Sequence, residues 1–264
     1  GIDAAGTVVS CDDNRFREGD EVIVTGFDLG MNTSGGFGEY IRIPSEWAVA
    51  KPNGLTLRES MVIGTAGFTA GLSVQGLVEH YVTPEKGDVL VTGATGGVGS
   101  VAVALLAKAG YSVVACTGKK EHEAFLKALG ASKVITRDEL LENKERPMLK
   151  ELYAGAIDTV GGEYLAQAIK ATQYGGTVTC CGLTASAELN VSVFPFILRG
   201  VSLLGIDSVQ CPMPPRLRLW DKLASEWKLD CLDELTQEIP LGDISTKIDA
   251  ILNGQVTGRT LVKL

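Results

Sequence analysis

The glycines between positions 93 and 99 are the residues in this sequence whose types and spacing point to the most specific chemistry. They follow a G-x-x-G-x-x-G pattern and come directly after the apolar run Val89–Val91. Glycine lets a backbone turn sharply and approach a ligand closely. A helix that begins after such a turn offers free N–H groups to an anion. The pattern therefore predicts a dinucleotide pyrophosphate site at Thr95, Gly96, Gly97 and Val98, with an empty strand-to-helix turn as the alternative.

The end of the next apolar run indicates which nicotinamide cofactor would fit. NAD-binding proteins carry an acidic residue there, which holds the ribose 2′-hydroxyl. This sequence reads Thr117-Gly118-Lys119-Lys120, with no acid before Glu121. A hydroxyl and cationic side chains suit a 2′-phosphate, so we expect Thr117, Gly118 and Lys119 to bind NADPH. The alternative is a pair of solvated lysines at the start of a surface helix.

The elements that must position these residues alternate along the middle of the chain. Apolar runs of strand length alternate with helix-like stretches, which is typical of βαβ units and a parallel sheet. Six strands with helices between them predict an α/β fold with a doubly wound, Rossmann-type sheet. The expected strands are 88–92, 111–116, 133–136, 156–160, 177–182 and 202–207, and the expected helices are 97–109, 120–129, 163–172 and 215–227.

The two ends of the chain have a different pattern. Short strand-like runs separated by turn residues occur at 6–9, 21–24 and 40–43, and another occurs at 260–263. We therefore expect an outer β-rich domain formed by residues 1–54 and 231–264. Residues 55–230 would form the Rossmann domain inserted between them.

Composition excludes several classes of function. The net charge is −8 over 264 residues, which argues against a nucleic-acid partner. We find no signal peptide and expect no membrane span. The six cysteines contain no C-x-x-C pair, so we expect free thiols in a reducing, cytoplasmic compartment. With two histidines, a Ser-His-Asp triad and a three-histidine metal site are both disfavoured.

Several motifs together resemble the zinc-free medium-chain dehydrogenase/reductases. They are the glycine loop and the runs at 2–8, 64–70, 154–162, 174–176, 194–200 and 258–262. The resemblance covers essentially the whole chain, and its nearest branch is the quinone oxidoreductase-like acryloyl-CoA reductases. It implies a GroES-like outer domain around the Rossmann domain, a cleft between them, and often a homodimer. No cysteine ligand lies near Ala66–Phe68 and a four-cysteine lobe is absent, so zinc is not expected.

The resemblance also implies a reaction and further site residues. NADPH would give a hydride to the β-carbon of an α,β-unsaturated acyl-CoA, and the α-carbon would take a proton. Thr69 would lie near the nicotinamide and Asn32 would face the substrate, as the catalytic candidates. The strand end Cys181-Gly182-Leu183 would pass under the cofactor, and Arg259 would reach a phosphate. Their alternatives are a helix N-cap for Thr69, a turn for Asn32, a strand end for 181–183 and a surface salt bridge for Arg259.

Family members have further strands before a segment like Gly1-Ile2-Asp3. We therefore expect the outer domain to lack its first part, including an Asn-Tyr motif that lines the family's active site. Three functions remain open: an NADPH-dependent acryloyl-CoA reductase, an NADPH:quinone oxidoreductase, and an NADPH-binding protein without turnover.

Overall fold

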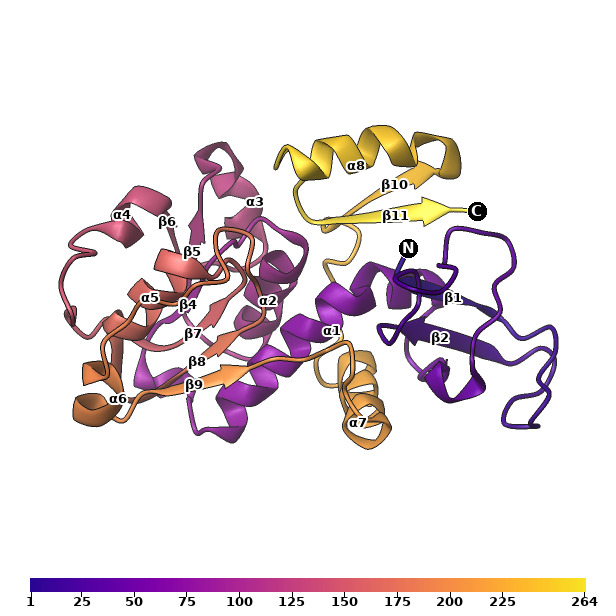
Figure 1. The fold of residues 1–264 in the computed structure, drawn as a ribbon, viewed down its shortest axis with the longest axis horizontal. Coiled ribbons are helices and arrows are strands. Elements are labelled where there is room, and N and C mark those ends of the chain that lie inside the picture. Colours follow the sequence, from indigo (N-terminus) through magenta and orange to yellow (C-terminus); the bar gives the residue numbers. More distant parts are fainter. The chain divides into compact units, whose positions relative to one another are not determined.

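A computed structural model describes all residues from Gly1 to Leu264, and the chain forms two compact units (Figure 1). The outer unit combines Gly1–Phe68 with Asp207–Leu264, and the inner unit is Thr69–Ile206. The outer unit is thus built from both ends of the chain. Its boundaries lie after Phe68 and Ile206, whereas the expected ones were at 54 and 231. The second boundary comes earlier because the chain leaves the inner unit directly after the last strand of the sheet.

The inner unit contains a six-stranded sheet in the order β6-β5-β4-β7-β8-β9, and every neighbouring pair is parallel (Figure 1). Numbered within the unit, this order is 3-2-1-4-5-6, which is that of the doubly wound dinucleotide-binding fold. The predicted fold class is confirmed. The strands are β4 (Val89–Val91), β5 (Val113–Thr117), β6 (Lys133–Thr136), β7 (Tyr153–Asp158), β8 (Thr172–Cys180) and β9 (Ser202–Gly205).

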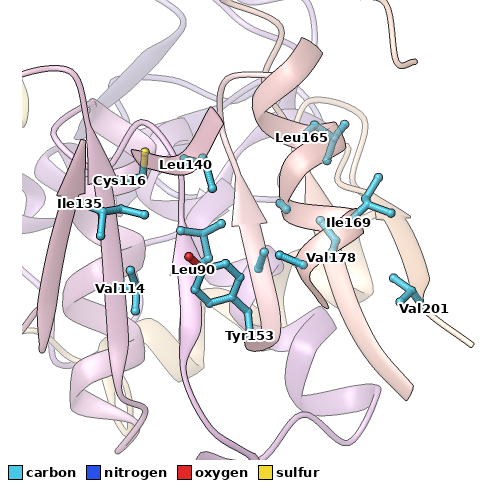
Figure 2. Close-up of a cluster of buried hydrophobic side chains, with 13 residues drawn as sticks. Leu90, Val114, Cys116, Ile135, Leu140, Tyr153, Leu165, Ile169, Val178 and Val201 are labelled. Carbon is cyan, nitrogen blue, oxygen red and sulfur yellow. The ribbon is translucent and has the colours of Figure 1, made fainter. Parts of the chain in front are cut away.

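The helices of the inner unit cover both faces of this sheet. Ala156 of β7 belongs to a buried cluster with Leu165 and Ile169, and Figure 2 labels these two side chains. A Cβ on the adjacent Gly155 would instead contact Leu77. Successive strand residues point to opposite faces, so the helices that carry these leucines lie on opposite sides of the sheet. The helices are α1 (Leu57–Glu79, which enters the inner unit at Thr69), α2 (Gly97–Lys108), α3 (Glu123–Ala128), α4 (Arg137–Leu141), α5 (Gly162–Ala171) and α6 (Phe194–Arg199), with 3-10 turns η2 (Pro84–Lys86) and η3 (Lys120–His122).

Helix α1 was not among the predicted helices. It is interrupted at Gly64, whose φ of 49° and ψ of −159° are not helical. By length and composition α1 is apolar enough to cross a membrane, although 61% of its most apolar window is buried inside the structure. A buried core helix passes the same test, and this degree of burial favours that interpretation.

The outer unit contains two small sheets. Strands β1, β2 and β3 form an antiparallel sheet, and β10 pairs in parallel with β11. The strands are β1 (Asp3–Thr7), β2 (Glu21–Thr25), β3 (Val49–Ala50), β10 (Thr236–Pro240) and β11 (Arg259–Lys263), and the helical segments are η1 (Ser45–Trp47), α7 (Met213–Ala224), η4 (Leu241–Asp243) and α8 (Ile244–Leu252).

One predicted strand is wrong. Residues 40–43 form no strand, and Tyr40 is 79% exposed. The run has alternating apolar residues, but a strand also needs a neighbour for its backbone hydrogen bonds. No other strand of the structure pairs with this segment.

Candidate cofactor site

The glycine loop lies between β4 and α2, at the point where the strand order reverses. Gly93 has a φ of 59°, a left-handed conformation that favours glycine. A Cβ at Gly93 would overlap the Thr159 hydroxyl, and one at Gly99 would overlap the Gly93 carbonyl oxygen. The glycines therefore let the loop pack closely against itself and against Thr159, which side chains at these two positions would prevent.

The first turn of α2 offers uncapped N–H groups. Gly96 is the N-cap residue and no side chain accepts a hydrogen bond from the turn. Gly96, Gly97 and Val98 are partly exposed. Unpaired amides at a helix N-terminus attract an anion, and this helix is twelve residues long. The arrangement fits a pyrophosphate at the position that the glycine spacing predicts.

Thr117 ends β5 and takes part in the loop's own hydrogen bonds. Its hydroxyl lies 3.1 Å from that of Thr95 and accepts a hydrogen bond of 3.0 Å from the Lys119 N–H. Thr117 is 3% exposed and Thr95 is 6% exposed. A hydroxyl has one proton to donate, so Thr117 can donate to a ligand only while Thr95 donates to Thr117.

Lys119 follows Thr117 and is partly buried. Burial lowers the pKa of its ammonium group, Glu121 opposes that shift, and the nearby Arg137 adds to it. Arg137 begins α4, directly after β6, and sequence reasoning did not single it out. The available signal was a basic residue at the end of the strand next to β5 in the sheet.

Asp158 joins three segments at this edge of the sheet. It is fully buried at the end of β7, and its carboxylate accepts the Thr92 hydroxyl at 2.7 Å and the Gly161 N–H at 2.8 Å. Thr159 in turn donates its hydroxyl to the Thr92 carbonyl oxygen at 2.9 Å. Burial raises the pKa of Asp158, and these hydrogen bonds oppose the shift. The network fixes the start of the glycine loop against the end of β7.

The segment Cys181-Gly182-Leu183 follows β8 at the same edge. The Cys181 N–H donates to the Asp158 carbonyl oxygen at 3.0 Å. A Cβ at Gly182 would overlap the backbone of Thr159, and Leu183 is 68% exposed. The ends of β4, β5, β7 and β8 thus bring together ten of the eleven residues predicted to bind the cofactor; only Arg259 lies in the other unit.

The remaining predicted residues have other surroundings. Thr69 is buried within α1, five residues after the break at Gly64, so it is not an N-cap. Asn32 is exposed and donates its side-chain amide to Asp28 at 2.7 Å. Arg259 donates to the Val62 carbonyl oxygen at 2.9 Å and faces Asp3 at 3.9 Å, with 18% of its side chain exposed. Its alternative role, a surface salt bridge, does not describe this mostly buried position.

No group of three or more histidine, cysteine, aspartate or glutamate side chains is arranged to hold a metal ion. The six cysteines are free thiols, as predicted.

Comparison with known proteins identifies the family. Residues 97–223 match the model of the zinc-binding dehydrogenases. A putative quinone oxidoreductase, YhfP of Bacillus subtilis, is 51% identical over 100% of this chain and 80% of its own length. The probable acrylyl-CoA reductase AcuI of Escherichia coli is 47% identical over 100% of this chain and 81% of its own length. This chain is a medium-chain dehydrogenase/reductase of the zinc-free branch.

Solved structures of this medium-chain dehydrogenase/reductase branch agree in fold. The yhdH oxidoreductase of Salmonella enterica, in complex with NADP, is 48% identical with a TM-score of 0.97, over 100% of this chain and 81% of that one. The yhfP protein of Bacillus subtilis, with NAD bound, is 50% identical with a TM-score of 0.97, over 100% of this chain and 80% of that one.

Proposed function

We propose that this protein reduces the carbon–carbon double bond of a short enoyl-CoA with NADPH, without zinc, converting acryloyl-CoA to propionyl-CoA. The observation that carries the proposal is the glycine loop, residues 93–99, which lies where the strand order reverses and is followed along the sheet by Lys119 at the end of β5. Relatives named acrylyl-CoA reductase in Escherichia coli and Ruegeria pomeroyi, at 47% and 45% identity, support the choice of substrate.

The residues present fit a dinucleotide. A Cβ at Gly93 or Gly99 would overlap neighbouring atoms, so the tight turn needs glycine at both positions, and the first turn of α2 that follows has no side-chain cap. Relatives of similar identity are described with NADP and with NAD, so similarity to them does not by itself distinguish the two cofactors. Lys119, in the place of the acid that holds a 2′-hydroxyl, favours NADPH.

When bound, NADPH supplies a hydride, and the protein's task is to orient and polarise. The β-carbon of acryloyl-CoA gains the hydride and the α-carbon gains a proton, so the C=C bond becomes a single bond and NADP⁺ remains. The amides of Gly97 and Val98 hold the pyrophosphate, with Thr95, Gly96 and Gly118 shaping the loop. The segment 181–183 supports the nicotinamide half of the cofactor.

The proposed roles of three further residues rest on the family resemblance. Thr69 positions the nicotinamide and Asn32 faces the substrate. Arg259 contacts a phosphate. It would do so through guanidinium N–H groups that do not face Asp3 or the Val62 carbonyl oxygen. Water is the simplest source of the proton.

A quinone is the second candidate acceptor, because the relative at 51% identity is named a putative quinone oxidoreductase. Initial rates of NADPH absorbance loss with acryloyl-CoA, crotonyl-CoA and a benzoquinone separate the two. We expect the highest kcat/KM with acryloyl-CoA. A higher value with the quinone would assign the second function, and tight NADPH binding without turnover on any acceptor would leave a binding protein.

We also propose a cytoplasmic homodimer. Strand β9 pairs only with β8 and so forms an edge of the sheet. Helix α6 leads into β9 through Gly200 and exposes four large apolar side chains, Val193 at its N-cap, Phe194, Ile197 and Leu198. An open edge beside an apolar patch needs covering, and a second copy of the chain provides a matching edge.

A further inference from the structure

Arg137 lies directly over the backbone of Gly118. A Cβ built on Gly118 would come within 2.7 Å of Arg137 Nε and 2.8 Å of Cζ. Gly118 is the residue between Thr117 and Lys119, at the end of β5. The guanidinium therefore lies beside the segment at which the second strand of this fold meets the cofactor's ribose.

The position of Arg137 is fixed from two sides. The preceding Thr136 forms a capping box with Glu139, which sets the backbone at the start of α4. The guanidinium Cζ lies 5.8 Å from the centre of the Tyr164 ring, which belongs to α5. A cation over an aromatic face is held weakly but in a defined direction. The Arg137 side chain therefore has a defined orientation, although the residue is exposed.

Lys119 and Arg137 are both positively charged, and no carboxylate forms an ion pair with Arg137. At Lys119, burial is the main cause of the lowered pKa, Glu121 opposes it, and Arg137 adds to it. Like charges held close to each other cost free energy in the absence of an anion and bind one when it is supplied. A planar guanidinium also matches the geometry of a phosphate group better than an ammonium does.

We propose that Arg137 binds the 2′-phosphate of NADPH together with Lys119 and is the main residue that selects NADPH over NADH. This inference rests on the proposed use of a nicotinamide dinucleotide. Thr117, whose hydroxyl is buried in local hydrogen bonds, then shapes the turn, and Gly118 leaves the space that the guanidinium occupies, which a side chain would reduce.

Calorimetric titration with adenosine 2′,5′-bisphosphate and with 5′-AMP tests the inference without any turnover. For Arg137→Gln we expect a loss of affinity for the bisphosphate of about tenfold to a hundredfold, the range of a charge-assisted phosphate contact. The affinity for 5′-AMP should stay within about twofold. Gly118→Ala keeps every charge but displaces Arg137, so it should weaken the bisphosphate by a smaller factor.

Lys108→Gln is the matched control. It removes one positive charge from the exposed last turn of α2, at the end of that helix opposite the glycine loop, and should change neither affinity by more than about twofold. Unchanged thermal unfolding of Arg137→Gln shows that the variant is folded.

Each other result overturns a distinct statement. An equal loss for both ligands in Arg137→Gln would place its contact on the adenosine 5′-phosphate that they share, and no loss for either would remove it from the site. If the unaltered protein binds the bisphosphate no better than 5′-AMP, the NADPH part of the proposed function fails, and the role of Arg137 fails with it.

Discussion

At the scale of single residues, Asp158 joins the start of the glycine loop to the end of β7. Its buried carboxylate accepts hydrogen bonds from Thr92, Val160 and Gly161. An amide in its place presents a donor to a cluster of donors, and an unsatisfied buried polar group costs about 1–3 kcal/mol. We expect Asp158→Asn to lower the free energy of unfolding by that amount in urea titrations. The control Asp138→Asn, at an exposed position, should change it by less than about 0.5 kcal/mol. Equal effects of the two variants would contradict this account of Asp158.

Thiol reactivity gives a second prediction at this scale. Burial raises the pKa of Cys116 and of Cys181 to about 12, with a smaller contribution from neighbouring charges such as Asp158. The thiolate is the reactive form, and an ordinary thiol is roughly a tenth ionised one pH unit below its pKa. At pH 8 these two cysteines should react with iodoacetamide far more slowly than in the urea-unfolded protein. Peptide mass spectrometry measures this, and labelling at the unfolded rate would contradict the buried environment.

At the scale of elements, the β4–α2 turn depends on close backbone packing. A Cβ at Gly99 would overlap the Gly93 carbonyl and lie 2.8 Å from Ala94 Cα. Gly99→Ala should therefore push α2 away from the turn and weaken NADPH binding by about tenfold or more. Gly205→Ala in β9 is the control, because a Cβ there meets nothing within 4 Å. Fluorescence titration with NADPH compares the two, and equal affinities would show that the turn tolerates a side chain.

The elements that the sequence predicted best are those with a local physical cause. The strand Lys133–Thr136 matched its expected bounds, and α2 began at the expected Gly97. The run at 40–43 had the same local pattern but lacks a partner strand, and pairing is not a local property.

Long-range packing also explains what the sequence did not predict at the site. Arg137 was missed because its role depends on the pairing of β6 with β5, in which each residue of β6 lies opposite the residue nineteen positions earlier. The break of α1 at Gly64 has a similar cause. A Cβ there would come within 2.6 Å of Asp3 Oδ2, a neighbour 61 positions away in sequence.

At the scale of the whole molecule, the exposed apolar surface of α6 predicts self-association. Ile197 and Leu198 are 68% and 58% exposed on the helix that leads into the edge strand β9. We expect light scattering to give twice the chain mass at micromolar concentration and Ile197→Glu to give the single-chain mass. Leu252→Glu, at the still more exposed end of α8, should leave the dimer intact. A single-chain mass for the unaltered protein would contradict the proposed homodimer.

The central claim is that a hydride passes from NADPH to the β-carbon of acryloyl-CoA on this chain. The direct measurement uses the two stereoisomers of NADPH deuterated at C4, with mass spectrometry of the acyl-CoA product. We expect one of the two to give propionyl-CoA with one deuterium at C3 for each NADPH consumed. NADPH consumption that yields no propionyl-CoA, or propionyl-CoA without deuterium from either stereoisomer, would contradict the account.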